Sequence, residues 1–487
     1  MHLRGASLLF LVLMSSAGIA ACAGSNFAGG SPGGPLPPAL VQKGTTPISH
    51  VVIVIQENRS FDNFFATFPG ADGTTSGKAA AMPASLASAC AAASMPPITK
   101  PTNVPLTEVD LLGHGFPGNY GYGWDLSHMS GGFKAEWDHN QMDGFDLVGL
   151  GTLGSGIPAC TYAYQYVNPA DIAPYWDLAK QYVLADHTFQ DQGSGSFTAH
   201  QDLIAGGTQI TPDEALIDTP SYFPWGCDGN PKSEVTAIIK RGGKIYPYGG
   251  PFPCLEYTTI RDLLDAKSVS WKFYAEAVYP YTKCPKCNGP GIWSAFDAIK
   301  AVRYSPEWKA NVTRNNRQIF SDISAKKLPA VAWVTPDGTD SDHLGVGKDT
   351  GPSWVASIVN AIGKSSYWNS TAIVIVWDDW GGLYDHLDPP KTRNWQGGPG
   401  LRVPMLIVSP YVKPHVDHTV YEFGSILQFV ENNWDLGTLG RGDEHSTSIR
   451  NAFDFNMAPR KFTVIPAKYS RDFFLRKKPS GLPPDTE

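Results

Sequence analysis

The chain has 487 residues, of which 42% are hydrophobic and 17% are charged, and its formal net charge is −7 at pH 7. A chain of this size and apolar content can bury a large core, as one large α/β domain or as two, so a disordered protein is excluded. The acidic balance and the lack of a long basic run exclude a partner bound through many phosphates, and we expect no nucleic-acid partner.

The N-terminal sequence is typical of targeting. Residues 1–21 contain the apolar stretch Leu8–Met14, which suits a signal peptide and is too short to span a membrane stably. The run Ile19–Cys22 resembles a bacterial lipobox, in which the cysteine becomes the lipid-modified first residue, and an ordinary cleavage site nearby is the alternative. Residues 22–45 are rich in Gly, Ser and Pro and predict a flexible linker. We therefore expect an exported protein of the periplasm or cell surface, anchored to the membrane through Cys22 or otherwise secreted.

The first predicted strand ends in two oxygen-bearing side chains. The apolar run Val51–Ile55 indicates a buried strand, and Glu57 and Asn58 follow it closely. Ligands in open α/β sheets bind beyond the carboxyl ends of parallel strands, so a metal ion or a phosphate could sit there. The alternative is that Asn58 only caps a helix beginning near Ser60 while Glu57 is solvated.

Two histidines follow in a polar block further along the chain. His128 ends the sequence that begins at Asp125, and His139 precedes the block Met142–Phe145. Either histidine could reach a phosphate pocket or stabilise a loop.

A Gly/Ser turn, Gln192–Ser196, leads into a helix-compatible stretch ending at Gly206 and Gly207. Ser196 would lie at the helix N-terminus, where backbone N–H groups and the helix dipole stabilise a developing alkoxide and a bound phosphate. The alternative is a serine that only caps the helix. A lipase is disfavoured, because the turn is not a Gly-x-Ser-x-Gly elbow.

Residues 207–305 are dense in Pro, Gly, Tyr and Cys and predict an insertion that caps the catalytic edge, with helices at Thr258–Ala266 and Trp293–Arg303. Its aromatic residues could cage a quaternary ammonium group or simply pack. They include Trp225, Tyr246, Tyr248, Trp271, Tyr274, Tyr279 and Tyr281.

The cysteine count predicts disulfides. Setting Cys22 aside from the 7 cysteines leaves an even number in a chain that we expect to be exported. The pairing does not follow from the sequence, although Cys227 with Cys254 and Cys284 with Cys287 would close local loops. The Cys284–Cys287 spacing could instead be half a zinc site or a redox pair.

Three later apolar runs predict strands at Ala330–Val334, Ala372–Val376 and Val403–Val408, with helical patterns at Trp354–Ile362 and Ser425–Trp434. Strands that alternate with helices indicate a mostly parallel sheet.

Polar residues follow two of these strands. Asp378 and Asp379 come after the second strand, and hard divalent cations prefer such oxygen ligands, although acidic turn residues are common after strands. A Gly-Gly turn and His386 follow. In the loop after the strand Ala330–Val334, His343 could donate a hydrogen bond to a phosphoryl oxygen or protonate a leaving group, with Asp342 orienting it. It could also simply be exposed.

Together these blocks resemble the bacterial phosphoesterase family that includes nonspecific phospholipases C and secreted acid phosphatases, within the alkaline-phosphatase-like superfamily. The resemblance runs from His50 to Phe455. Its blocks are Glu57–Asp62, Asp125–His128, Met142–Phe145, Ser194–His200, Ser341–His343, Asp378–His386, Arg402–Pro404 and Val408–Pro410.

The resemblance implies an α/β, alkaline-phosphatase-like three-layer fold with a mostly parallel central sheet flanked by helices, plus the capping insertion. The catalytic domain would span residues 46–460, followed by a C-terminal extension at 461–487. The implied roles are Ser196 as nucleophile, Glu57, Asn58, Asp378 and Asp379 as ligands of a divalent metal ion, and His128, His343 and His386 around the phosphate. A phosphoseryl intermediate would form, and metal and histidines would neutralise the phosphoryl oxygens.

The chain departs from the family pattern in three places. Many relatives carry Asn three residues after the nucleophile, whereas this chain has Ala199 followed by His200, which could replace that phosphate contact. Asp379 stands where Glu is frequent. The chain ends at Glu487, so we expect the C-terminal domains of some haemolytic phospholipases, and their membrane-active toxicity, to be absent.

Three functions follow as hypotheses. The first is an exported phospholipase C acting on a phospholipid head group, and the alternative is a secreted acid phosphatase acting on a phosphomonoester. The third is a non-catalytic surface lipoprotein, which the retained ligand residues disfavour. A sulfatase is disfavoured because no Cys/Ser-x-Pro-x-Arg motif is present.

Overall fold

The computed structural model describes residues 44–114, 125–150, 157–221, 226–275, 293–391, 396 and 398–480. The predicted signal peptide, Cys22 and nearly all of the predicted linker lie outside the described residues, as does the Cys284–Cys287 motif. Within the described ranges, none of the helices combines the length and the apolarity that a membrane crossing requires.

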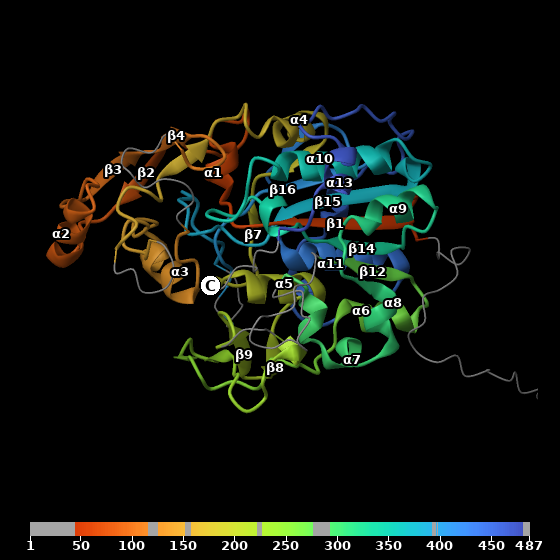
Figure 1. The fold of residues 1–487 in the computed structure, drawn as a ribbon, viewed down its shortest axis with the longest axis horizontal. Coiled ribbons are helices and arrows are strands. Elements are labelled where there is room, and N and C mark those ends of the chain that lie inside the picture. The colour runs from red at the N-terminus through yellow and green to blue at the C-terminus, as the bar shows by residue number, and fades with distance from the viewer. Residues whose placement is uncertain are drawn as a thin grey trace, which may run out of the picture. The chain divides into compact units, whose positions relative to one another are not determined.

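An eight-stranded sheet lies at the centre of the fold, in the order β13-β12-β14-β1-β15-β16-β6-β17 (Figure 1). The strands are β13 Val312–Thr313, β12 Trp271–Tyr274, β14 Val331–Val334, β1 His50–Gln56, β15 Thr371–Trp377, β16 Met405–Val408, β6 Val183–Ala185 and β17 His415–Asp417. Neighbouring strands pair in parallel except at β16, which runs antiparallel to both β15 and β6. The predicted mostly parallel sheet is confirmed.

Helices cover both faces of this sheet. In Figure 1, α4, α9, α10 and α13 lie on one side of the strands, and α5, α6 and α11 lie on the other. Their bounds are α4 Ala173–Gln181, α9 Gln318–Ser324, α10 Gly351–Gly363, α13 Arg471–Arg476, α5 Ser196–Ala205, α6 Ile260–Ala266 and α11 Phe423–Trp434. The helices predicted from Trp354 and Ser425 correspond to α10 and α11.

Two tryptophans identify the faces. The partners of Trp333 and Trp377 on β1 are three residues apart, so the two indoles point to opposite faces of the sheet. Trp377 packs against Tyr175 of α4, with ring centroids 4.9 Å apart. Trp333 donates a hydrogen bond from Nε1 to the main-chain oxygen of Leu203 in α5, 3.1 Å away. Because both faces are covered, β1 and β15 are buried along their whole length, which explains their unbroken apolar runs.

The predicted insertion at 207–305 contains two kinds of structure. A separate antiparallel sheet, in the order β11-β10-β9-β8, is formed by β11 Ile245–Tyr246, β10 Ala237–Lys240, β9 Glu214–Ile217 and β8 Gln209–Thr211. By contrast, α6 packs against α5 and α11, and β12 pairs with β14 in the central sheet. The part with its own sheet is therefore shorter than the predicted insertion.

Two disulfides join loops of the structure. The expected Cys227–Cys254 bond is present, and a second bond joins Cys90 of helix α2 (Ala84–Ala92) to Cys160. The disulfides predicted from the even cysteine count are thereby confirmed for these four residues.

The remaining described elements lie outside the two sheets named above. They are α1 Phe61–Phe65, β2 Ser76–Ala79, α2 Ala84–Ala92, β3 Thr102–Pro105, β4 Thr107–Val109, α3 Ser130–Trp137, η2 Asp138–Asn140, β5 Gln165–Val167, β7 Thr188–Phe189, η3 Gly226–Asp228, η4 Ala295–Ala298, α7 Lys300–Arg303, α8 Pro306–Asn311, η5 Gly338–Asp340, η6 Trp368–Ser370, β18 Tyr421–Glu422, α12 Gly442–His445 and η7 Ile449–Ala452.

The C-terminal segment packs against helix α10 and the 3-10 helix η5. Phe474 of α13 packs against Trp354 of α10, with ring centroids 5.4 Å apart. Lys477 then contacts the Asp340 carboxylate and donates to the Thr339 hydroxyl 2.6 Å away, both in η5. The predicted extension from residue 461 is thus attached to the core at residues 474–477.

Candidate active site

The carboxyl ends of β1 and β15 bring the two acidic motifs together. Gln56 of β1 pairs with Trp377 of β15, so Glu57 and Asp378 are the next residues on two adjacent parallel strands. The Asp378 amide donates to the Gln56 carbonyl at 2.9 Å, which extends the pairing by one step. Both carboxylates are fully buried. The expected meeting of the two motifs at one sheet edge is therefore observed.

Tight backbone turns hold this edge in place. Asn58 has a φ of +57°, in the left-handed region that Asn tolerates better than most residues, and its amide donates to Asp378 Oδ1 at 3.0 Å. Gly381 has a φ of +62°, and a Cβ on it would lie 2.5 Å from the Asn58 carbonyl oxygen. A residue with a side chain would therefore push the turn away from Asn58.

Ser196 is the first residue of α5, as predicted. Its hydroxyl is buried and donates a hydrogen bond to Asp379 Oδ2 at 3.2 Å. The other carboxylate oxygen, Oδ1, accepts from the Gly381 amide at 2.7 Å, which fixes the orientation of Asp379. The serine thus has a carboxylate acceptor on one side and the positive end of a ten-residue helix on the other.

His200 lies one helical turn after Ser196 and shares its face of α5. Its Nε2 is 3.3 Å from Glu57 Oε1 and 3.6 Å from Asp378 Oδ2. The sequence suggested His200 as a phosphate contact, whereas the structure places it between two predicted metal ligands.

His128 is also part of this group. Its Nδ1 lies 2.6 Å from the Leu126 carbonyl, which can only accept, so Nδ1 donates there. Nε2 then accepts from the Asn58 side-chain amide at 3.1 Å and lies 3.9 Å from Asp379 Oδ2. His343 is adjacent, with its ring centroid 6.1 Å from that of His128 and its Nδ1 bonded to the Leu344 carbonyl.

The structure places His386 in a different cluster. Its Nδ1 is 2.7 Å from Asp62 Oδ2 and its Nε2 is 3.2 Å from Asp72 Oδ1. Burial alone would lower the pKa of His386, but the hydrogen bond and negative charge of Asp62, with the charge of Asp385, raise it above the usual value. The ring nitrogens of His386 are therefore bonded to Asp62 and Asp72, away from the group around Ser196.

Two secondary expectations need revision. Asp342 does not orient His343, because its Oδ2 accepts from the Tyr175 hydroxyl at 2.7 Å and from Trp377 Nε1 at 3.0 Å. His139 is on the surface, with a 91% exposed side chain.

Sequence reasoning missed Glu136. Its Oε2 accepts from Trp380 Nε1 at 2.6 Å, although the two residues are 244 positions apart. Burial raises the pKa of the Glu136 carboxyl well above its usual value, while the hydrogen bond from Trp380 and the charge of His128 oppose the shift and Asp379 adds to it. No local motif signals this residue, because Trp380, its hydrogen-bond partner, comes from a distant part of the sequence.

Of the aromatic residues expected to form the cage, three described ones pack within the fold and a fourth is exposed. Trp271 and Tyr274 belong to the buried strand β12, and the Tyr274 hydroxyl donates to Asp322 at 2.9 Å. Tyr246 contacts lysines of its own small sheet, and Tyr248 is 78% exposed. The remaining members of the predicted cage, Trp225, Tyr279 and Tyr281, lie outside the described residues.

The donor set fits a divalent cation. Glu57, His200 and Asp378 each offer one ligand atom, and these atoms lie within 4.8 Å of one another. Asp378 Oδ2 is buried and accepts no hydrogen bond from the described part of the chain. Carboxylates held so close together need a positive charge, and an ion between them would supply it.

Comparison with known proteins identifies the family of this chain. The model of the Phosphoesterase family matches residues 48–437, a range that includes every residue of the site. The chain belongs to the Phosphoesterase family.

Individual relatives of this family member are distant. A non-hemolytic phospholipase C of Pseudomonas aeruginosa is 23% identical over 80% of this chain, and the alignment covers 54% of that protein. An acid phosphatase of Aspergillus fumigatus is 28% identical over 38% of this chain and 41% of its own length. A solved protein of the alkaline phosphatase superfamily from Vibrio parahaemolyticus has a TM-score of 0.30 and 12% identity, covering 56% of this chain and 63% of that one.

Proposed function

We propose that this chain is an exported phosphoester hydrolase of the phospholipase C type that works through a phosphoseryl intermediate. The observation that carries the proposal is the hydrogen bond from the Ser196 hydroxyl to Asp379 Oδ2 at 3.2 Å, at the N-terminus of α5. A serine with a carboxylate proton acceptor and a helix N-terminus beside it meets the needs of a nucleophile that attacks phosphorus.

The reaction follows from these positions. Asp379 Oδ2 accepts the hydroxyl proton while Ser196 Oγ forms a bond to phosphorus, and the bond from phosphorus to the leaving oxygen breaks. We assign protonation of that leaving oxygen to His343 as an imidazolium, which donates from Nε2 because Nδ1 is bonded to the Leu344 carbonyl. His128 contacts a phosphoryl oxygen as an imidazolium too, with its Nε2–H in place of the bond from the Asn58 amide. Water then attacks the phosphoserine and gives a proton to His343, the bond from Oγ to phosphorus breaks, and Oγ takes back the proton held by Asp379.

The predicted divalent cation has a matching set of residues. Glu57, Asp378 and His200 would hold it, with Asn58 and Asp379 at the same edge. When bound, such an ion supplies positive charge to phosphoryl oxygens and makes a nearby hydroxyl more acidic.

The phospholipase C reading is preferred to the phosphomonoesterase reading because of how the relatives align. The non-hemolytic phospholipase C aligns with 80% of this chain, whereas the acid phosphatase aligns with 38%. The substrate would then be a phospholipid with a head group such as phosphocholine. A secreted acid phosphatase remains the second candidate, because both activities need the same serine and charges.

The test is the Ser196→Ala variant, compared with Ser194→Ala from the same turn. Ser194 accepts a hydrogen bond from the Asp218 amide at 2.8 Å and belongs to no step of the reaction. Turnover of p-nitrophenyl phosphorylcholine should fall by about 10³-fold or more in Ser196→Ala and by less than about 10-fold in Ser194→Ala. Full activity of folded Ser196→Ala would refute the assignment of Ser196 as the nucleophile. Faster cleavage of p-nitrophenyl phosphate than of the choline diester by the wild type would favour the phosphatase.

We also propose export and a lipid anchor at Cys22. The support is the N-terminal sequence pattern, together with disulfides that suit an oxidising compartment. Metabolic labelling with a radioactive fatty acid tests the anchor, because Cys22→Ala should abolish the label.

A further inference from the structure

Among the described residues there are three groups of acidic and histidine side chains that could hold a metal ion. In each group, three ligand atoms lie within 4.8 Å of one another. They are Glu57, His200 and Asp378; Asp62, Asp385 and His386; and Asp186, His187 and His418. The first group is the candidate active site. The second already holds a cation, because Arg402 lies 3.2 Å from Asp62 and 3.0 Å from Asp385.

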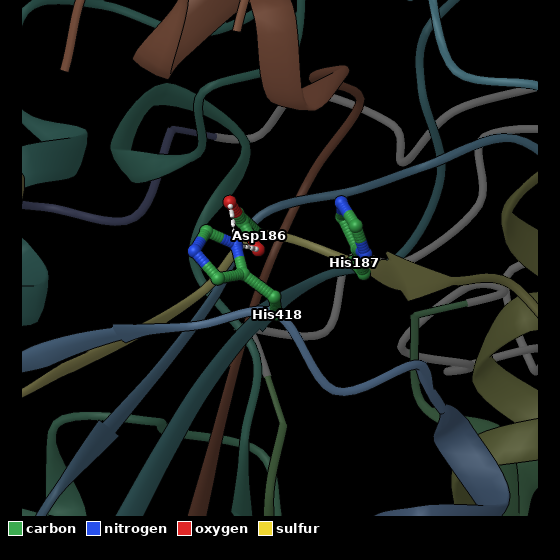
Figure 2. Close-up of side chains that lie close together, drawn as sticks. All are labelled: Asp186, His187 and His418. Carbon is green, nitrogen blue, oxygen red and sulfur yellow. Dashed lines mark hydrogen bonds and ion pairs between the residues drawn. The ribbon is translucent and has the colours of Figure 1, made fainter. Parts of the chain in front are cut away.

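We propose that the third group, Asp186, His187 and His418, is a second metal site with a preference for Zn²⁺ and similar transition-metal ions. Figure 2 shows His418 bonded to the Asp186 carboxylate, with the His187 side chain beside them. This site does not depend on the proposed function, since it shares no residue with the group around Ser196.

The fold brings these residues together by strand pairing. Ala185 of β6 pairs with Asp417 of β17, so Asp186 and His418 are the next residues on two adjacent parallel strands. His418 Nδ1 lies 3.0 Å and 2.9 Å from the two oxygens of Asp186. His187 follows Asp186 directly, and its ring centroid is 5.8 Å from that of His418.

A fourth donor stands beside the group. Asp72 Oδ2 lies 3.0 Å from His187 Nε2, and the Asp72 amide donates to Asp186 Oδ2 at 2.8 Å. Two imidazoles and two carboxylates make a mixed nitrogen and oxygen set, which suits Zn²⁺ better than Mg²⁺ or Ca²⁺, because those ions prefer oxygen ligands alone.

Burial and charge also favour a cation here. Asp186 is fully buried, whereas the side chains of His187 and His418 are 21% and 58% exposed, so an ion can enter from solvent and meet a desolvated carboxylate. Arg402 bonds to the main-chain oxygens of Asp72 and Asp186, but Asp62 and Asp385 balance its charge. The bound ion would tie the loop after β6 to the loop after β17.

Zinc titration of the metal-stripped full-length chain tests the proposal, with Zn²⁺ as the probe for the number of sites. We compare the wild type with His418→Ala and His187→Ala, and use His415→Ala as the matched control. His415 lies on the same strand β17, is exposed, and bonds through Nδ1 to the Lys413 carbonyl. Isothermal titration calorimetry gives the number of sites, and the nitrogen hyperfine pattern of bound Cu²⁺ reports imidazole ligands directly.

The wild type and His415→Ala should bind one more Zn²⁺ than His418→Ala, and His187→Ala should weaken this site at least about 10-fold. An excess of Mg²⁺ should not displace the ion. Equal Zn²⁺ binding by all four proteins would overturn the proposal, and so would loss of the ion in His415→Ala. Because His418 is largely exposed, circular dichroism should show that its variant keeps the fold. Glu57→Gln, which changes only the candidate active site, should leave this ion in place; losing it would also refute a separate site.

Discussion

Arg402 is a fully buried cation that joins two buried carboxylates. Its Nε lies 3.0 Å from Asp385 Oδ1 and its Nη2 lies 3.2 Å from Asp62 Oδ1. Its Nη1 donates to the main-chain oxygens of Asp72 at 2.7 Å and Asp186 at 2.9 Å. Substituting Arg402→Met keeps much of the side-chain volume but removes these hydrogen bonds and leaves both carboxylates without their common counter-charge.

The size of the effect follows from burial. Removing one partner of a buried ion pair typically costs about 3–5 kcal/mol. Burial already raises the pKa of Asp385 to about 6 although the charge of Arg402 opposes the shift. Without Arg402 this carboxyl should be protonated at neutral pH, which keeps the expected cost within this range. With an unfolding entropy of about 2.1 cal/mol/K per residue, the chain should lose roughly 3–5 °C in Tm.

Differential scanning calorimetry at pH 7.5 measures this change. Arg402→Met should melt about 3–5 °C below the wild type, whereas Arg450→Met, at an exposed arginine, should stay within about 1 °C. Adding Asp385→Asn to Arg402→Met should restore part of the loss, because one fewer buried charge is left unpaired. If Arg402→Met melts within about 1 °C of the wild type, the carboxylates are solvated and the reasoning fails.

Three further predictions concern the site and its supports. Asp379→Asn removes the charged acceptor of the Ser196 hydroxyl and should lower kcat by about 10²–10⁴-fold on p-nitrophenyl phosphorylcholine; an unchanged kcat would show that another group takes the proton. Burial raises the pKa of Asp342 to about 6 from 3.8, so the wild type should lose about 3 kcal/mol of stability from this group as the pH rises through 6. Asp342→Asn should therefore be the more stable protein in chemical denaturation at pH 7.5 and lose that advantage near pH 4; equal stability at both values would contradict the shift. Gly382 has a φ of +67° and an added Cβ would lie 2.4 Å from a neighbouring side-chain carbon, so Gly382→Ala should cost about 2–3 kcal/mol. Gly242→Ala, where nothing lies within 4 Å, is the control for strain alone, and an equal loss in both variants would exclude the steric contribution.

The central sheet and its polar edge could be predicted because their signals are local. Buried parallel strands need continuous apolar runs, and β1 and β15 have them. Parallel pairing then fixes which residues meet, so Glu57 and Asp378 had to be neighbours once the two strands were adjacent. Ser196 was accessible to the same reasoning, since the Gly/Ser turn before an apolar helix marks its N-terminus.

Other features depend on contacts that no motif or spacing in the sequence indicates. β12 has four residues, includes Lys272, and lies inside a Pro- and Gly-rich region, so its pattern did not indicate a strand of the central sheet. His386 follows the acidic turn by only a few residues, and spacing does not tell whether it faces Ser196 or Asp62. Glu136 meets Trp380 through a buried hydrogen bond, and no motif joins the two.

The attachment of residues 471–480 links this segment to the loop of the candidate active site that carries His343. Phe474 packs α13 against α10, and Lys477 donates a hydrogen bond to η5. The loop that carries His343 follows η5 directly. A change in the position of residues 471–480 would therefore move that loop. A fused protein, a tethering surface or a bound partner could cause such a change. A tag or a surface attachment at residues 471–480 is therefore expected to shift the loop that carries His343.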